Sequence, residues 1–125
     1  MGKRSLARKL ENNQASASRK YLRTSPRKLG LVAGLIRGRK AHEAIIQLQF
    51  CKKRIANDVK SVLQAAIANA ENNHNLDIDS LVISEVRVGK AFTMKRFHAR
   101  ARGRGNRIEK PFSNIEIIVT EQEEE

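Results

Sequence analysis

A long basic stretch near the C-terminal end of the chain limits what this protein can fold into. Residues 89–107 read GKAFTMKRFHARARGRGNR, with no acidic residue, many Lys and Arg, and two glycines near the end. Such a segment has very little apolar surface to bury, so it contributes little to a hydrophobic core. The core of this 125-residue chain must therefore come from the segments on either side.

Three amphipathic helices are predicted before this stretch, because apolar residues recur there at helical spacing. Ser25 suits an N-cap and Pro26 suits the first helical position, and Gly38 is placed to end the same helix. The second helix is expected at about 41–50 and the third at about 52–72. The apolar positions are Leu29, Val32, Ala33 and Ile36, then Ala41, Ala44, Ile45 and Leu48, then Ile55, Val59, Val62, Leu63, Ala66, Ile67 and Ala70.

Strands are predicted on both sides of the basic stretch. Residues 81–88 are rich in β-branched side chains, and residues 115–119 place Ile115, Ile117 and Val119 on one side of a strand and Glu116 on the other. A further edge strand is expected at 18–23. A strand, three helices and two long strands in that order predict an α+β fold, with three helices packed on one face of a small antiparallel sheet.

The basic stretch itself is predicted to be the outer part of a long β-hairpin. Folding the chain about Arg102 places Val88 opposite Glu116, so the arm spans about 88–116 and the turn about 100–105. An isolated two-stranded ribbon is marginally stable in water, so we expect a partner to order it. A disordered basic loop is the alternative reading.

The positive charge of the chain is concentrated in two blocks, and this separation predicts a polyanionic partner. The net charge is +12; residues 1–28 carry nine basic and one acidic residue, and residues 87–110 again carry nine and one. Residues 29–86 are nearly balanced, with seven basic and six acidic residues. Surfaces that serve solubility alone intersperse the two signs, whereas nucleic-acid-binding proteins gather Lys and Arg.

The two ends are expected to lie outside a single folded domain at 18–120. Residues 1–17 are interpreted as a flexible basic arm, with a transit peptide as the alternative. Residues 121–125 are interpreted as a flexible acidic tail. An alternative role for that tail is to shield the basic blocks before they bind their partner.

No catalytic or metal-binding pattern is visible in the sequence. Cys51 is the only cysteine, and His42, His74 and His98 fall on separate predicted elements with no nucleophile–base pair nearby. Cys51 follows an apolar helical pattern and is predicted to be a small, at least partly buried hydrophobe. We therefore expect no enzyme activity, no metal and no cofactor, and no apolar run is long enough to span a bilayer.

Three segments in the same order carry a family resemblance. They are SPRKLGLVAGLIRGRKAHEAI at 25–45, AAIANAENNH at 65–74 and MKRFHARARGRGNRIEKPFSNIEIIV at 94–119. Together they resemble the bacterial-type L22 (uL22) family of large-subunit ribosomal proteins, over roughly 19–120. The signature positions in the third segment are Lys95, Arg100, Ala101, Gly103, Arg104, Asn114, Ile115, Ile117 and Val119.

The resemblance implies a structural protein of the large ribosomal subunit. Its α+β body would lie on the outer face of the subunit, and its hairpin would thread through 23S-type rRNA to line the nascent-peptide exit tunnel. The implied partners are 23S-type rRNA, other large-subunit proteins and the nascent polypeptide, with no membrane and no homo-oligomer. A role in early assembly and an influence on macrolide response are also implied. The implied location is the cytoplasmic ribosome, with an organellar ribosome as the alternative.

The basic blocks and the resemblance together define two groups of candidate site residues. Phe92, Phe97 and His98 are further candidates for stacking on bases or sugars. The rRNA-binding group is Arg19, Lys20, Arg23, Arg27, Lys28, Arg39, Lys40, Lys90, Lys95, Arg96, His98, Arg100, Arg107 and Lys110. The tunnel-lining group at the hairpin tip is Met94, Lys95, Arg96, Arg100, Ala101, Arg102, Gly103, Arg104 and Gly105.

Two other function classes remain open at this point. A free-standing basic RNA-binding regulator would have the same composition, but it has no evident need for an arm as long as its body. A small enzyme using one of the three histidines is the weakest reading, because nothing in the sequence partners them.

Overall fold

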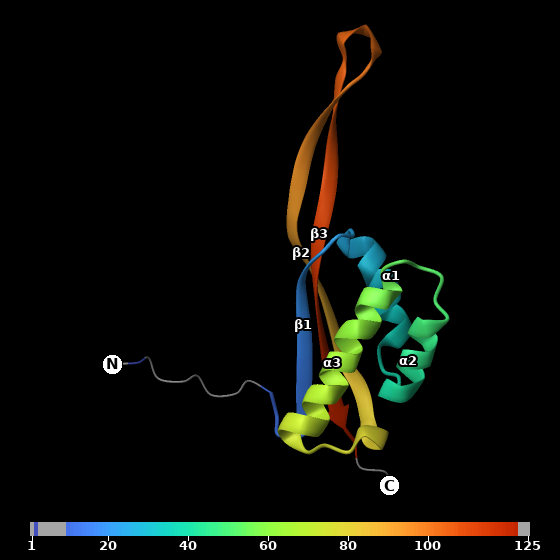
Figure 1. The fold of residues 1–125 in the computed structure, drawn as a ribbon, viewed down its shortest axis with the longest axis vertical. Coiled ribbons are helices and arrows are strands. Elements are labelled where there is room, and N and C mark those ends of the chain that lie inside the picture. The colour runs from blue at the N-terminus through green and yellow to red at the C-terminus, as the bar shows by residue number, and fades with distance from the viewer. Residues whose placement is uncertain (1, 3–9, 123–125) are drawn as a thin grey trace.

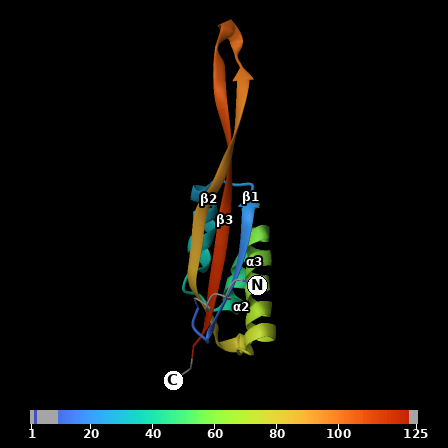
Figure 2. The ribbon, with the colours of Figure 1, turned by 90° about the vertical axis from the view of Figure 1, so that its left-hand side faces the viewer.

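The computed structural model describes residues 2 and 10–122, and its elements follow the expected order (Figure 1). Three helices cover one face of a three-stranded antiparallel sheet with strand order β1-β3-β2, which confirms the predicted α+β fold (Figures 1 and 2). The elements are β1 (Gln14–Leu22), α1 (Pro26–Ile36), α2 (Ala41–Gln49), α3 (Ala56–His74), β2 (Leu81–Ala99) and β3 (Gly105–Glu121). Short 3-10 turns occupy Ile78–Ser80 and Ala101–Gly103.

The core lies between the helices and the inner half of the sheet. The expected helical stripes are buried there, although Ile45 and Ile67 are only partly covered. From the sheet, alternate residues of β3 point to the helices because side chains alternate along a strand. Cys51 is partly buried against this core, as predicted. The core side chains contributed by β2 and β3 are Leu81, Ile83, Val86, Ile115, Ile117 and Val119.

The start and end of α1 follow the sequence signals. The Ser25 side chain accepts a hydrogen bond from the backbone N–H of Lys28 at 3.3 Å, and Pro26 occupies the first turn. After the helix, Gly38 adopts a φ of 75°, a conformation that glycine tolerates best. This helix therefore begins and ends where its capping residues predict.

The third helix differs from its predicted bounds at both ends. It begins at Ala56 instead of about residue 52, and it continues to His74 instead of about residue 72. Lys52, Lys53 and Arg54 are consecutive positive charges, which the helix dipole disfavours in a first turn. At the other end Asn75 adopts a left-handed φ of 53°, so the helix ends there and not at about residue 72.

The first strand also begins earlier than predicted. It runs from Gln14 to Leu22 instead of 18–23, so its first four residues come from the segment interpreted as a flexible arm. These residues pair with β3, from Gln14 opposite Thr120 to Ala17 opposite Ile117. The remainder of that segment at 1 and 3–9, and residues 123–125 of the acidic tail, lie outside the described part of the chain.

The long hairpin has the predicted symmetry in its outer half. Ala99 pairs with Gly105 and Phe92 with Phe112, so the arm is centred on Arg102. A bulge between Lys90 and Phe92 then shifts the register by one residue, and Val88 pairs with Ile115 instead of Glu116. The extra residue in β2 bends and twists the hairpin where it leaves the body.

The arm projects well beyond the body and adds nothing to the core (Figure 1). Among the described residues, no buried hydrophobic residue lies between 87 and 112. The hydrophobic core therefore stabilises the body, and the arm has no such core.

Within the described part of the chain, no helix is both long and apolar enough to cross a bilayer.

Candidate nucleic-acid interface

The tip of the arm is a closed turn rich in arginine. Arg100 donates its backbone N–H to the carbonyl oxygen of Arg104 at 2.6 Å, which closes the loop above the last strand pair. Arg102 and Gly103 both have positive φ, at 64° and 67°. All three tip arginines are exposed, so the turn presents three guanidinium groups on a short segment of backbone.

A contact between an aromatic ring and a glycine supports the turn from below. A Cβ added to Gly105 would lie 1.8 Å from Cζ of Phe97, far inside van der Waals contact. The Phe97 ring therefore occupies the space that any other side chain at 105 would need. The arm thus has one internal packing contact at its tip, beside residues that are otherwise exposed.

We expect Gly105→Ala to loosen the tip without affecting the body. The new methyl group must displace the Phe97 ring, at a cost of roughly 1 kcal/mol or more for an overpacked site. Hydrogen exchange of the Arg100 amide, measured by NMR, is then expected to be about fivefold faster or more. Gly89→Ala is the matched control, because a Cβ at Gly89 meets no atom within 4 Å. Equal exchange in both variants would show that the ring does not support the turn.

The predicted tip group divides into two parts in the structure. Residues 100–105 form the turn and the first residue of β3, as expected. Lys95 and Arg96 instead pair with Glu109 and Ile108, several residues back along the arm. At ~3.3 Å per strand residue they lie about 10–13 Å behind Ala99, and Met94 lies further back still.

All fourteen residues of the predicted rRNA-binding group are exposed, but they do not form one continuous site. His98 and Arg107 belong to the outer arm, near the tip. Arg39 and Lys40 lie beside the opposite end of β2, where Lys40 bridges to Val82. The arm and its root, not the whole basic surface, therefore form the concentrated part of the candidate interface.

A basic hollow lies at the root of the arm, beside the first turn of α1. It has a volume of about 640 Å³ and brings together side chains from α1, from the α2–α3 connection and from β3. Two of its cations, Lys53 and Arg54, were missing from the sequence prediction. The run of three basic residues KKR at 52–54 could have identified them, but this run was assigned to the start of the third helix and was not considered as a binding site. The five basic residues that line the hollow are Arg23, Lys28, Lys53, Arg54 and Lys110.

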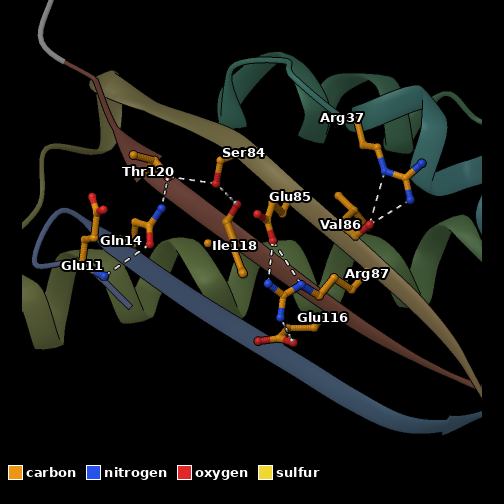
Figure 3. A network of polar contacts seen from close by, with 10 residues as sticks. All are labelled: Glu11, Gln14, Arg37, Ser84, Glu85, Val86, Arg87, Glu116, Ile118 and Thr120. Carbon is orange, nitrogen blue, oxygen red and sulfur yellow. Dashed lines mark hydrogen bonds and ion pairs between the residues drawn. The ribbon is translucent and has the colours of Figure 1, made fainter. Parts of the chain in front are cut away.

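Some positive charges in the body are already paired with acids. Arg19 Nη1 lies 3.3 Å from Asp58 Oδ1, which ties β1 to α3. Arg87 Nη2 lies 2.8 Å from Glu85 Oε2, and its Nη1 lies 3.8 Å from Glu116 Oε2 (Figure 3). Arg19 and Arg87 are therefore partly neutralised by the body itself, whereas among the described residues no arginine at 96–107 forms an ion pair.

The face of the sheet opposite the helices carries a network of polar side chains (Figure 3). Gln14 donates its side-chain amide to Thr120, and the Thr120 hydroxyl donates to Ser84 at 2.8 Å. Ser84 in turn donates to the carbonyl oxygen of Ile118. On the helix side of β2, the Arg37 guanidinium donates to the carbonyl oxygen of Val86 at 2.8 Å. These contacts join the strands and a helix end and leave the sheet face accessible.

The three histidines occupy the places that their sequence context predicts. His42 lies in the first turn of α2, His74 ends α3 and His98 lies on the arm. Within the described residues, no group of three or more His, Cys, Asp or Glu side chains is arranged to hold a metal ion. The structure therefore gives these side chains no shared site.

The fold and the surface define the class of protein. It is a small α+β protein with a folded body and a long, strongly basic β-hairpin arm. The sequence model of the family described as ribosomal protein L22p/L17e matches residues 17–120. The chain therefore belongs to the L22p/L17e family of ribosomal proteins. This is a family of ribosomal proteins and not of enzymes.

Relatives match over almost the whole chain. A protein of Agrobacterium fabrum named large ribosomal subunit protein uL22 is 57% identical over 99% of this chain and 96% of its own length. Proteins of the same name from Methylorubrum populi and Rhodospirillum centenum are 60% and 58% identical, over 97% and 100% of this chain and 95% of each relative. The family resemblance seen in the sequence is thus confirmed.

Proposed function

We propose that this protein is a structural constituent of the large ribosomal subunit that binds 23S-type rRNA and assists subunit assembly. The observation that carries the proposal is the match to the family at 17–120, together with near full-length relatives named as large-subunit proteins. Other large-subunit proteins are the accompanying partners. The cytoplasmic ribosome is the proposed location.

The charge of the arm supports rRNA as its partner. Between residues 94 and 110 the arm carries seven Lys and Arg residues and one acid, Glu109. An arm without a core is stabilised when phosphates neutralise these charges and release bound counterions. The basic hollow at its root offers a second cluster of cations beside the body, so the arm and its root would contact the RNA together.

The shape of the arm supports a role for its tip away from the body. A narrow two-stranded ribbon reaches into spaces between RNA helices that the body, a sheet with helices on one face, is too wide to enter. We propose that the turn at 100–105 lines the nascent-peptide exit tunnel, where Arg102 and its neighbours meet phosphates or the passing polypeptide. The closed turn and the Phe97–Gly105 contact give that tip a defined shape.

We expect the purified protein to bind large-subunit rRNA with a steep salt dependence. Each phosphate contact contributes about 0.7–0.9 to the slope of log K against log salt, so the seven Lys and Arg residues at 94–110 give a slope of about −5 or steeper, to which the cations at the arm root add. Replacing both Lys95 and Arg96 by alanine is expected to reduce that slope by roughly 1.5. Filter binding across a salt series measures both slopes.

Lys60→Ala is the matched control, because Lys60 lies on α3, outside the arm, and lines neither the hollow at the arm root nor the hollow on the sheet. Its slope is expected to equal that of the wild type. A flat salt dependence for the wild type would contradict rRNA binding. Failure to cofractionate with large subunits at high magnesium would instead favour a free-standing regulator.

A further inference from the structure

A second hollow lies on the open face of the sheet, where the arm leaves the body. Its volume is about 370 Å³, and it is lined by residues of all three strands. Buried Ile115 points to the helices, so its neighbours on β3 point to the opposite, uncovered face. The residues that line the hollow on that face are Ser18, Lys20, Arg87, Gly89, Asn114 and Glu116.

The floor of this hollow is a glycine paired with an asparagine. Gly89 lies opposite Asn114 in the β2–β3 ladder, and a Cβ built on Gly89 meets no atom within 4 Å. Asn114 Oδ1 accepts the backbone N–H of Tyr21 at 3.2 Å, which assigns its NH₂ group to the other side of the amide. That NH₂ group donates no hydrogen bond within the described part of the chain, so it is free to meet an acceptor.

An aromatic cluster lies next to the hollow on the side of the arm, because Phe112 and Asn114 are two residues apart on the same face of β3; its rings are not themselves part of the lining. Phe92 and Phe112 are paired across the ladder and stacked, with ring centroids 4.6 Å apart and an interplanar angle of 8°. The Tyr21 ring meets Phe92 edge-on at 5.6 Å. Tyr21 is 62% exposed and Phe92 41% exposed, so both rings keep accessible surface.

The backbone at Tyr21 is held in a conformation that bulky residues rarely adopt. Its φ is 66°, in the left-handed region, at a register shift between Arg19 and Leu22. Such strain persists only where surrounding contacts fix it, and here the hydrogen bond to Asn114 and the contact with Phe92 do so. The exposed ring is thus fixed next to Asn114, which lines the hollow.

We propose that this hollow binds one unpaired nucleobase of RNA. The base would stack on the aromatic cluster of Tyr21 and Phe92, and the Asn114 NH₂ group would donate to an acceptor on its edge. Lys20, which forms no ion pair within the described residues, would meet the adjoining phosphate. Arg87 is held by its two glutamates and does not serve as that anchor.

The chemistry of the site favours an unpaired base over a duplex. Bases inside a duplex are stacked on their neighbours, so their faces are not free to meet a protein ring. Single-stranded RNA exposes those faces, and stacking on aromatic side chains accepts any base. This inference rests on the proposed function, since it assigns part of the rRNA to a particular place on the protein.

The affinity test compares Tyr21→Leu with Tyr21→Phe, using transcribed large-subunit rRNA as the probe. Tyr21→Phe keeps the ring and is expected to bind as the wild type does. Tyr21→Leu is expected to bind about tenfold more weakly, with an unchanged salt slope, because stacking involves no counterions. Tyr21 is largely exposed, so both variants are expected to melt near the wild-type temperature.

The spectroscopic test uses the fact that Tyr21 is the only tyrosine in a chain without tryptophan. A single-stranded RNA of about eight nucleotides is expected to quench the tyrosine emission, and a duplex of equal length is not. Gly89→Leu is expected to fill the hollow and abolish the quenching, although Tyr21 remains. This variant separates loss of the site from loss of the ring.

The outcomes separate this inference from the proposed function. If the wild type binds rRNA with a steep salt slope and Tyr21→Leu binds equally well, the base site is wrong and the proposed function stands. Equal quenching by duplex and single strand has the same meaning. If the wild type shows no salt-dependent binding to rRNA, both proposals fail.

Discussion

Replacing residues 93–111 by Asn-Gly is expected to abolish tight rRNA binding while leaving the body folded. Phe92 and Phe112 are directly paired in the ladder and both have a backbone N–H, unlike Pro111, so a two-residue hairpin turn can join them without changing the register below. The replacement removes seven Lys and Arg residues and one acid. The salt slope is then expected to fall by roughly 5, and affinity near physiological salt by about a thousandfold or more.

The body is expected to tolerate this change because the removed segment contributes nothing to its core. Within the described chain, every buried hydrophobic residue lies outside 87–112, and the aromatic cluster at the arm root is retained. Circular dichroism melting is expected to remain cooperative, with a midpoint within a few degrees of the wild type. Loss of cooperative melting would show that the arm stabilises the body.

A second variant, which removes charge but keeps the arm, identifies the cause of the lost affinity. In the full-length arm, Lys95, Arg96 and Arg107 can be replaced together by glutamine, which keeps the ladder and removes three charges. If charge dominates, the salt slope of this variant is expected to be smaller in magnitude by roughly 2–3 than that of the wild type, although the arm is retained. A variant that binds like the wild type would show that the shape of the arm, and not its charge, carries the affinity.

The sequence predicted the outer hairpin well because its determinants are local. Two glycines near Arg102 and similar strand patterns on both sides define a turn, and the observed pairs from Phe92 to Phe112 share that centre. The bulge between Lys90 and Phe92 was not predictable in the same way. Nothing in the local pattern distinguishes the extra residue, because the bulge depends on how β3 pairs with two strands at once.

The sequence predicted which kinds of side chain form the candidate interface, but not which of them lie together in the fold. The basic residues are exposed as expected, yet Lys53 and Arg54 join Lys110 only through tertiary packing. Phe92 was a candidate for stacking on bases or sugars, and in the structure it already stacks on Phe112 and meets the edge of Tyr21. Sequence spacing cannot bring Tyr21 to that place, because the contact joins strands separated by three helices.

Two isoleucines of β3 are expected to differ strongly in their contribution to stability, because one lies in the body and the other in the arm. Ile117 and Ile108 both lie in β3; Ile117 is fully buried in the core, whereas Ile108 is 38% exposed on the arm. Ile117→Ala removes buried methyl groups and leaves a cavity, which typically costs about 2–5 kcal/mol of unfolding free energy. For a domain of this size we expect the melting temperature to fall by roughly 10 °C or more.

Ile108→Ala is the matched control, because it makes the same chemical change in the same strand. Its side chain touches no core residue, so the free energy of unfolding is expected to change by less than about 0.5 kcal/mol. Urea unfolding followed by circular dichroism measures both values, with an equal m-value if the same body unfolds. A comparable loss in both variants would mean that the hairpin unfolds together with the core. In that case the arm would be stabilised by the body before any RNA binds, and phosphate contacts would serve affinity and not order.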